Sequence, residues 1–215
     1  MSAKSMIREP PSGIDLLVVG AGIGGLSAAI ECHRKGHNVR VIEKRSDFST
    51  FGVYMSPPVI YAPCIPGART LSAFTNTEAK GDLIAITRSA QRTMLKWPGF
   101  LPRLQANAMP PRLWYFKFDG TELFSLSDID KGKEGIISLT LWRNQLHEEL
   151  YKYTSELEIP VTFSRQAVAY EEDDDSGSVL TAEGEKYVAD LVIAADGIAS
   201  KSIDMMILQD TGEVK

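Results

Sequence analysis

The sequence predicts an α/β fold built on a parallel sheet, and three observations lead to this prediction. An apolar run of strand length, Ile14 to Val19, ends in glycines and passes directly into a helical pattern. A β-rich segment, Asn38 to Ile42, follows that helix and completes a strand, helix, strand unit. A late segment, Asp190 to Ala195, is apolar after its first residue, so we expect it to be buried in the same sheet.

The turn after the first strand has the spacing G-x-G-x-x-G, with glycines at positions 20, 22 and 25. In such a turn the first glycine permits a tight bend, and the second lets a diphosphate approach the backbone. The third lets the helix pack closely on the strand. Free N–H groups and the dipole at the helix N-terminus favour an anion there. The motif therefore predicts a dinucleotide-binding unit, and a glycine-rich turn without a ligand is the alternative.

The first helix and second strand support this interpretation. The helical pattern runs from Gly24 to Lys35 and stops at Gly36, a residue typical of helix C-termini. The second strand is followed by Glu43, where a carboxylate can accept hydrogen bonds from both hydroxyls of an adenosine ribose. An ordinary surface glutamate is the alternative. Residues predicted to share one face of the helix are Leu26, Ala29, Ile30 and His33.

Composition argues against several classes of function. The net charge is −5, the pI is near 5.3, and lysines and arginines are spread along the chain, so no nucleic-acid partner is expected. Residues 1–13 are polar and broken by proline, which predicts a disordered N-terminus and no signal or membrane segment. Cys32 and Cys64 lack disulfide or metal spacing. We therefore expect a cytoplasmic protein.

The middle of the chain alternates irregular and regular segments. From Val59 to Arg88 neither helical nor strand periodicity persists. A helix is predicted from Ser89 to Trp97, and a hairpin over 113–126 turns at Asp119-Gly120. A β-rich run over 136–141 then leads into a helix over 142–153. On that helix one face carries Leu146, Leu150 and Tyr153.

The last third of the chain predicts a short strand over 161–164 and a hairpin over 167–182. Five acids, Glu171 to Asp175, lie at the hairpin tip, where a solvated turn is favoured over a metal site. Asp196 and Gly197 follow the final strand. Because ligands bind outside the carboxyl ends of parallel strands, we expect Asp196, Gly20 and Glu43 to face one crevice.

Three separated motifs, in this order, resemble those of the class A FAD-dependent monooxygenases, the aromatic-ring hydroxylases related to p-hydroxybenzoate and salicylate hydroxylase. The turn with Gly20, Gly22, Gly24 and Gly25, together with Glu43, is similar to the site for the ADP half of FAD. Arg143 opens a helix similar to the family's R-x-x-L-x-x-x-L, whose arginine reaches the FAD. A surface arginine on an amphipathic helix is the alternative.

The third motif and one additional segment complete the resemblance. Asp196 and Gly197 match the family's D-G signature, which is linked with both FAD and NADPH binding, although a plain turn is the alternative. Gly52 and Val53 open a segment similar to the G-x-x-h-x-P-P of fungal members, which lies beside the flavin. The resemblance thus spans residues 14–202 as an FAD-binding domain.

The resemblance implies a Rossmann-like, glutathione-reductase-type FAD-binding fold with β-hairpin insertions. It also implies FAD as cofactor, NAD(P)H as electron donor, and hydroxylation of an aromatic or enol small molecule, such as a secondary metabolite, with O2. Because the flavin carries the chemistry, no catalytic residue is identified. His33, His37 and His147 lack metal spacing and are expected to be surface or structural residues, with no metal bound.

The sequence also departs from the family pattern. Residues 59–88 look inserted, as translated non-coding sequence or a recent insertion, and the tail over 203–215 diverges. The C-terminal part of the family fold is missing, so the chain looks truncated. Two alternatives to an FAD-dependent monooxygenase therefore stay open: a non-catalytic remnant, or a nicotinamide-dependent oxidoreductase with the same Rossmann-like unit.

Overall fold

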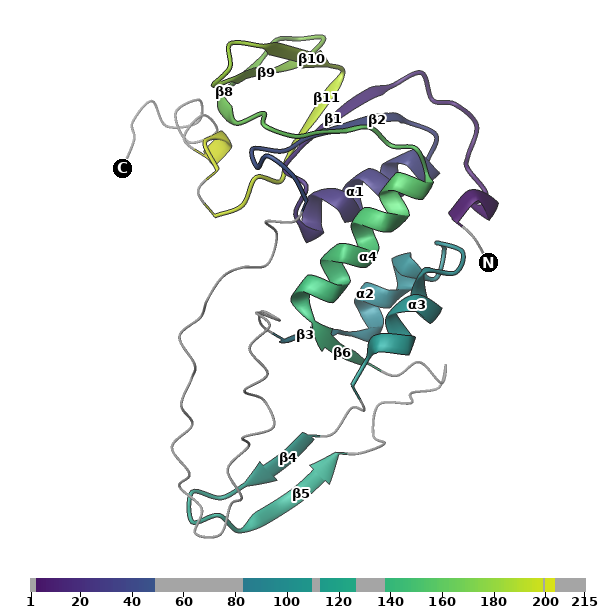
Figure 1. Cartoon of the computed structure of the whole chain (residues 1–215), viewed down its shortest axis with the longest axis vertical. Coiled ribbons are helices and arrows are strands. Elements are labelled where there is room, and N and C mark those ends of the chain that lie inside the picture. The colour runs from purple at the N-terminus through teal and green to yellow at the C-terminus, as the bar shows by residue number, and fades with distance from the viewer. Residues whose placement is uncertain (1–2, 49–82, 110–112, 127–137, 199, 204–215) are drawn as a thin grey trace. The chain divides into compact units, whose positions relative to one another are not determined.

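The computed structural model describes residues 3–48, 83–109, 113–126, 138–198 and 200–203 (Figure 1). The chain divides into two units. The first comprises Met1–Phe51, Trp97–Phe100 and His147–Lys215, and the second comprises Gly52–Lys96 and Leu101–Leu146. Among the described residues, no helix is both long enough and apolar enough to cross a membrane.

A four-stranded parallel sheet forms the centre of the first unit, with the strand order β11-β1-β2-β7. Apolar side chains fill β1: Leu16, Leu17, Val18 and Val19 are each at most 2% exposed. This sheet confirms the predicted α/β fold. Its strands are β1 (Asp15–Val19), β2 (Asn38–Ile42), β7 (Val161–Thr162) and β11 (Leu191–Ala194).

Helix α1 (Ile23–Arg34) connects β1 to β2, within one residue of the predicted bounds. Its C-terminus has the two hydrogen bonds of a Schellman motif: the His37 N–H donates to the Cys32 carbonyl oxygen (3.1 Å), and the Gly36 N–H donates to that of His33 (3.0 Å). This motif requires a left-handed residue, and Gly36 has φ +92°. The glycine therefore ends the helix as predicted. The apolar face is buried at Leu26, Ala29 and Ile30.

The N-terminal segment differs from the expectation of disorder. It begins with η1 (Ala3–Ser5), and the Arg8 side chain donates hydrogen bonds to three backbone carbonyls at the end of α1. Glu9 adds ion pairs to Arg34 (3.5 Å) and Lys35 (2.9 Å). A guanidinium at a helix C-terminus satisfies carbonyls that lack an intrahelical partner and complements the helix dipole. The polar composition that suggested disorder in fact supplies these contacts.

The first unit also contains a second sheet, which is antiparallel. It consists of β8 (Ala167–Glu172), β9 (Gly177–Thr181) and β10 (Lys186–Ala189). The predicted hairpin corresponds to β8 and β9. Between them the Asp173 carboxylate accepts the N–H groups of Asp175 and Ser176, which is a hydrogen-bonded turn. One cluster joins the two sheets and contains Leu17, Val19, Ile42, Tyr170, Val179 and Ala189.

The prediction that the last strand is buried is wrong. β11 lies at the edge of the parallel sheet, with β1 as its neighbour, and Leu191 is 51% exposed. An apolar run alone cannot distinguish a central strand from an edge strand, because burial depends on which elements cover it.

Helix α4 (Arg143–Glu156) has the predicted apolar face, with Leu146, Leu150 and Tyr153 all buried. In the first unit, the Tyr153 hydroxyl donates to the Pro98 carbonyl oxygen (3.1 Å), and its ring lies edge-on to Phe100 at 5.2 Å. The Trp97 indole N–H donates to the Glu31 carboxylate of α1 (3.0 Å). These contacts hold the 97–100 segment against both helices.

Among its described residues, the second unit contains two antiparallel pairs of strands, β3 (Leu83–Ile86) with β6 (Leu139–Trp142) and β4 (Leu113–Phe116) with β5 (Glu122–Leu126). The second pair is the predicted hairpin. Helix α2 (Arg88–Met94) is shorter than predicted, and α3 (Phe100–Asn107) begins at the last residue of the 97–100 segment. β3 corrects the prediction that regular structure is absent as far as Arg88. The rest of the proposed insertion, 59–82, lies outside the described residues.

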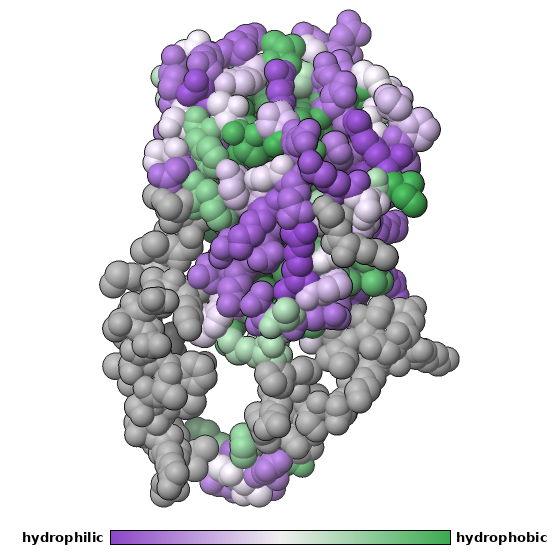
Figure 2. All heavy atoms as spheres, turned by 45° about the vertical axis from the view of Figure 1, so that its right-hand side comes forward, coloured by the Kyte–Doolittle hydropathy of each residue, from purple (hydrophilic) through white to green (hydrophobic). Residues whose placement is uncertain are grey.

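Figure 2 shows that hydrophilic residues cover much of the visible face, with apolar patches between them. This distribution is ordinary for a globular protein, because scattered apolar side chains occur on every protein surface.

Candidate dinucleotide-binding site

The carboxyl ends of three parallel strands meet at one edge of the central sheet. In the sheet register, Val19 of β1 lies opposite Ile42 of β2 and Ala194 of β11. The hydrogen bonds continue past the strands, since the Gly20 N–H donates to the Ile42 carbonyl oxygen (2.7 Å) and the Ala195 N–H to that of Val19 (2.8 Å). The glycine turn, Glu43 and Asp196 therefore all follow strands that end at this edge.

Two glycines of the turn have no room for a side chain. Gly20 has φ +100°, and a Cβ there would collide with the Ala195 carbonyl. A Cβ on Gly25 would collide with the Gly20 carbonyl oxygen, so this glycine permits the close contact between α1 and β1. Gly22 and Gly24 are different, because a Cβ on either would meet nothing within 4 Å. The turn is thus closed on its protein side and open at the positions where a ligand is expected to approach.

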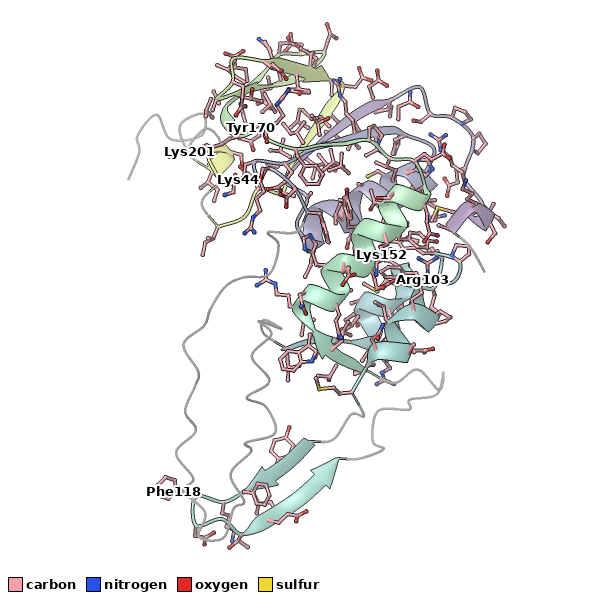
Figure 3. All side chains as sticks on the ribbon, viewed as in Figure 1. Lys44, Arg103, Phe118, Lys152, Tyr170 and Lys201 are labelled. Atoms are coloured by element: carbon pink, nitrogen blue, oxygen red, sulfur yellow. The ribbon has the colours of Figure 1, made fainter. Side chains whose placement is uncertain are left out.

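The N-terminus of α1 offers uncapped N–H groups. Its N-cap is Gly22, which provides no side-chain hydrogen bond, and the first turn contains no acidic residue. The positive end of the helix dipole is therefore available to an anion. Figure 3 labels Lys44, which follows Glu43, and Lys201, which follows the D-G signature; both are exposed.

Ala21, between the first two glycines, is held from two sides. Its N–H donates to Glu43 Oε2 (2.8 Å), and its carbonyl oxygen accepts a hydrogen bond from His147 Nε2 (2.6 Å). All three groups are buried, with Glu43 5% and His147 6% exposed. The backbone of the turn is therefore fixed by one side chain that follows β2 and another on α4.

The Glu43 carboxylate accepts hydrogen bonds from two backbone N–H groups and can accept further hydrogen bonds from a ligand. Its Oε1 accepts the Arg45 N–H (3.0 Å), while its Oε2 accepts that of Ala21. An ionised carboxylate has about four lone-pair positions, so two backbone donors leave room for two ribose hydroxyls. This donor and acceptor chemistry fits the ribose contact expected from the sequence.

Asp196 carries a buried oxygen without a partner. Its Oδ2 accepts a hydrogen bond from the Tyr170 hydroxyl (2.8 Å), whereas its Oδ1 has no hydrogen-bond partner among the described residues. An unsatisfied buried carboxylate oxygen is unfavourable unless another donor approaches it. Burial, followed by the hydrogen bond to Asp196, raises the pKa of Tyr170 well above its ordinary value, so the phenol stays a donor. Asp196 Oδ1 is thus an acceptor suited to a ligand donor.

The remaining predicted site residues lie in the second unit, directly after Asp196, or outside the described residues. Arg143 is exposed at the start of α4, in the second unit, and Gly197 is an exposed residue with φ +93° directly after Asp196. Gly52 and Val53 lie outside the described residues. His147 was expected to be structural or on the surface, and its contact with the glycine turn was missed. A single histidine on a helix gives no signal in the sequence for such a contact.

Comparison with known proteins agrees with this geometry. The family described as "FAD binding domain" matches residues 15–56, which include the glycine turn and Glu43. The chain is 33% identical over 202 residues to the FAD-dependent monooxygenase nodY2 of Hypoxylon pulicicidum, covering 91% of this chain and 40% of that protein. It is 34% identical over 197 residues to the asperlicin C monooxygenase of Petromyces alliaceus, covering 90% of this chain and 36% of the relative.

Solved structures give the same result. The crystal structure of FqzB matches with a TM-score of 0.70 at 24% identity, covering 97% of this chain and 40% of FqzB. CtdE in complex with FAD and substrate 4 matches with a TM-score of 0.67 at 26% identity, covering 89% of this chain and 40% of CtdE. The chain spans about two fifths of the length of these proteins. By its fold, its glycine turn and these relatives, the chain is similar to part of the FAD-dependent monooxygenases.

Proposed function

We propose that this chain forms the FAD-binding part of a monooxygenase that hydroxylates an aromatic or enol small molecule with NAD(P)H and O2. The observation that carries this proposal is the glycine turn, whose backbone is held at Ala21 by Glu43 and His147. Its open positions and uncapped helix N-terminus lie at the same sheet edge as the Glu43 carboxylate. The similarity to fungal enzymes such as the asperlicin C monooxygenase supports a secondary metabolite as the class of substrate.

In this proposal each residue has a defined role. The amides at Gly22 and Gly24 bind the diphosphate, Gly20 and Gly25 shape the turn, and Glu43 accepts the ribose hydroxyls. Asp196 accepts a donor from the ligand at its buried oxygen, and Gly197 provides the left-handed turn after it. By family resemblance, Arg143, Gly52 and Val53 complete the contacts to FAD.

When bound, FAD supplies the redox chemistry, by taking a hydride from NAD(P)H and activating O2 for transfer of one oxygen atom to the substrate. The residues of this chain bind and orient it. The buried contacts of Ala21, Glu43 and Tyr170 keep the turn and the D-G segment in one arrangement before the ligand arrives, which lowers the entropic penalty of binding.

The proposal is tested by titrating FAD into the purified 215-residue chain and following flavin fluorescence. The Glu43→Gln variant has nearly the same shape but loses the charge, so we expect its FAD affinity to fall about tenfold or more. The matched control is Glu183→Gln, at an exposed acid in the turn between β9 and β10, which should leave the affinity unchanged. If the wild-type chain does not bind FAD, or if Glu43→Gln binds it equally well, the proposal is wrong.

Turnover distinguishes the remaining functions. FAD-dependent oxidation of NAD(P)H with substrate hydroxylation supports the monooxygenase, whereas FAD binding without turnover indicates a non-catalytic chain. Dehydrogenase activity without flavin would support the nicotinamide-dependent alternative.

A further inference from the structure

The peptide bond between Ala21 and Gly22 occupies the centre of the proposed diphosphate site. A trans peptide is planar, and its C=O and N–H groups point in opposite directions; the described residues contain no cis peptide bond. The Ala21 carbonyl oxygen lies 2.6 Å from His147 Nε2 on α4. The Gly22 N–H therefore points away from His147.

Reversing this peptide would present a carbonyl oxygen where the anion should bind. A carbonyl carries partial negative charge and repels a phosphate, whereas an N–H attracts it. A turn containing glycine reorients easily, since Gly22 has no Cβ to restrict its backbone. Something outside the turn must therefore determine which group of this peptide faces the ligand.

Two side chains restrict the peptides on either side of Ala21. Glu43 accepts the Ala21 N–H and fixes the preceding peptide, while His147 contacts the Ala21 carbonyl and fixes the following one. The imidazole is itself held in place, because it is 6% exposed and its centroid lies 5.0 Å from the Phe48 ring. Phe48 in turn stacks on Tyr151, one helical turn after His147, at 4.1 Å.

We infer that His147 is a positioning residue for FAD: its Nε2–H binds the Ala21 carbonyl and thereby directs the Gly22 N–H toward the diphosphate. This inference rests on the proposed function and deepens it, because it assigns the orientation of the site to a residue outside the glycine motif. It requires the tautomer with the proton on Nε2, since a carbonyl oxygen can only accept.

The experiment compares FAD dissociation constants of the wild-type chain, His147→Leu and His147→Gln. Leucine removes the donor, so we expect affinity to fall about ten- to a hundredfold. Glutamine restores an N–H donor on a side chain of similar reach and should bind within about threefold of wild type. The matched control is His37→Leu, whose imidazole contacts the Ser12 hydroxyl (2.8 Å), and it should bind FAD as wild type does.

The tautomer is measured independently by 15N NMR of the histidine ring in the free chain. We expect a proton on Nε2 of His147. The inference is overturned if the wild type binds FAD and His147→Leu binds it equally well, if glutamine fails to restore binding to a folded variant, or if the proton resides on Nδ1. A wild-type chain that binds no FAD would instead contradict the proposed function itself.

Discussion

At the scale of single residues, the site depends on buried polar groups that hold backbone or carboxylate oxygens in place. Tyr170 illustrates this. Its ring belongs to the cluster between the two sheets of the first unit, and its hydroxyl donates to Asp196 Oδ2. One side chain thus links the packing of the core to the D-G segment. The expected consequence is that the geometry of Asp196 responds to a change in the core.

Tyr170→Phe should remove only the hydroxyl and should alter how stability depends on pH. The pKa of Tyr170 is raised in the folded chain, so its contribution to stability is complete below the unfolded value, near 10, and decreases as the pH rises above it. We expect the wild-type free energy of unfolding to fall more steeply above pH 10 than that of the variant.

Urea denaturation of both proteins between pH 8 and about pH 11 measures this difference. Tyr115→Phe, at an exposed tyrosine on β4, is the control and should follow the wild type throughout. Parallel pH profiles for the wild type and Tyr170→Phe would show that burial and the hydrogen bond to Asp196 do not raise the pKa of Tyr170 in solution.

Residue-level predictions from sequence succeeded where a motif dictates the backbone. Gly20, Gly25 and Gly36 are required by a left-handed conformation or a close contact, and such requirements leave a pattern that a sequence reveals. The contacts of His147 and Tyr170 could not be predicted, since their partners lie 126 and 26 residues away and depend on tertiary packing.

At the scale of elements, α1 and its neighbours show which signals define secondary structure. β1, α1 and β2 combine an apolar run, a glycine turn and a helix-ending glycine, and their predicted bounds agree closely with the structure. β3 and β10 have four residues each and were missed. Short strands of this kind form because a partner strand is present, so local sequence contains little information about them.

Two adjacent glycines in α1 provide a matched test of helix packing. In Gly25→Ala the new methyl group would collide with the Gly20 carbonyl oxygen, so we expect a loss of about 2 kcal/mol or more of unfolding free energy. Gly24→Ala places the same group in open space on a helix, and it should stabilise the chain by about 0.5–1 kcal/mol.

Urea denaturation without FAD measures both variants under the same conditions. Equal stabilities, or a larger loss for Gly24→Ala, would mean that α1 does not pack on β1 as described. The Gly24 variant also tests the site, because a methyl group on the open side of the turn should weaken FAD binding although the protein is more stable.

At the scale of the whole molecule, the first unit contains the proposed site for the ADP half of FAD. The strand edge, the uncapped helix N-terminus and the carboxylates of Glu43 and Asp196 all belong to it. The fold class and family could be predicted because these motifs occur in a fixed order along the chain. The exposure of β11 could not, since it depends on which segments cover the edge of the sheet.

Because FAD is expected to bind the folded chain and not the unfolded one, it should stabilise the protein by an amount that rises with the logarithm of the FAD concentration. At a hundred times the dissociation constant the gain is about 2.7 kcal/mol, which should raise the melting temperature by several degrees. Differential scanning calorimetry over a series of FAD concentrations measures this effect, and FMN at equal concentration is the control. A melting temperature independent of FAD would contradict binding to the native state.

Calorimetric titration with FAD, ADP and FMN measures whether the glycine turn and Glu43 hold the ADP half of FAD. FMN contains the same isoalloxazine ring and ribityl phosphate but lacks the AMP portion of FAD. If the turn and Glu43 hold the ADP half, ADP binds and competes with FAD, while FMN binds far more weakly than FAD. Tight binding of FMN, together with no competition from ADP, would contradict this assignment.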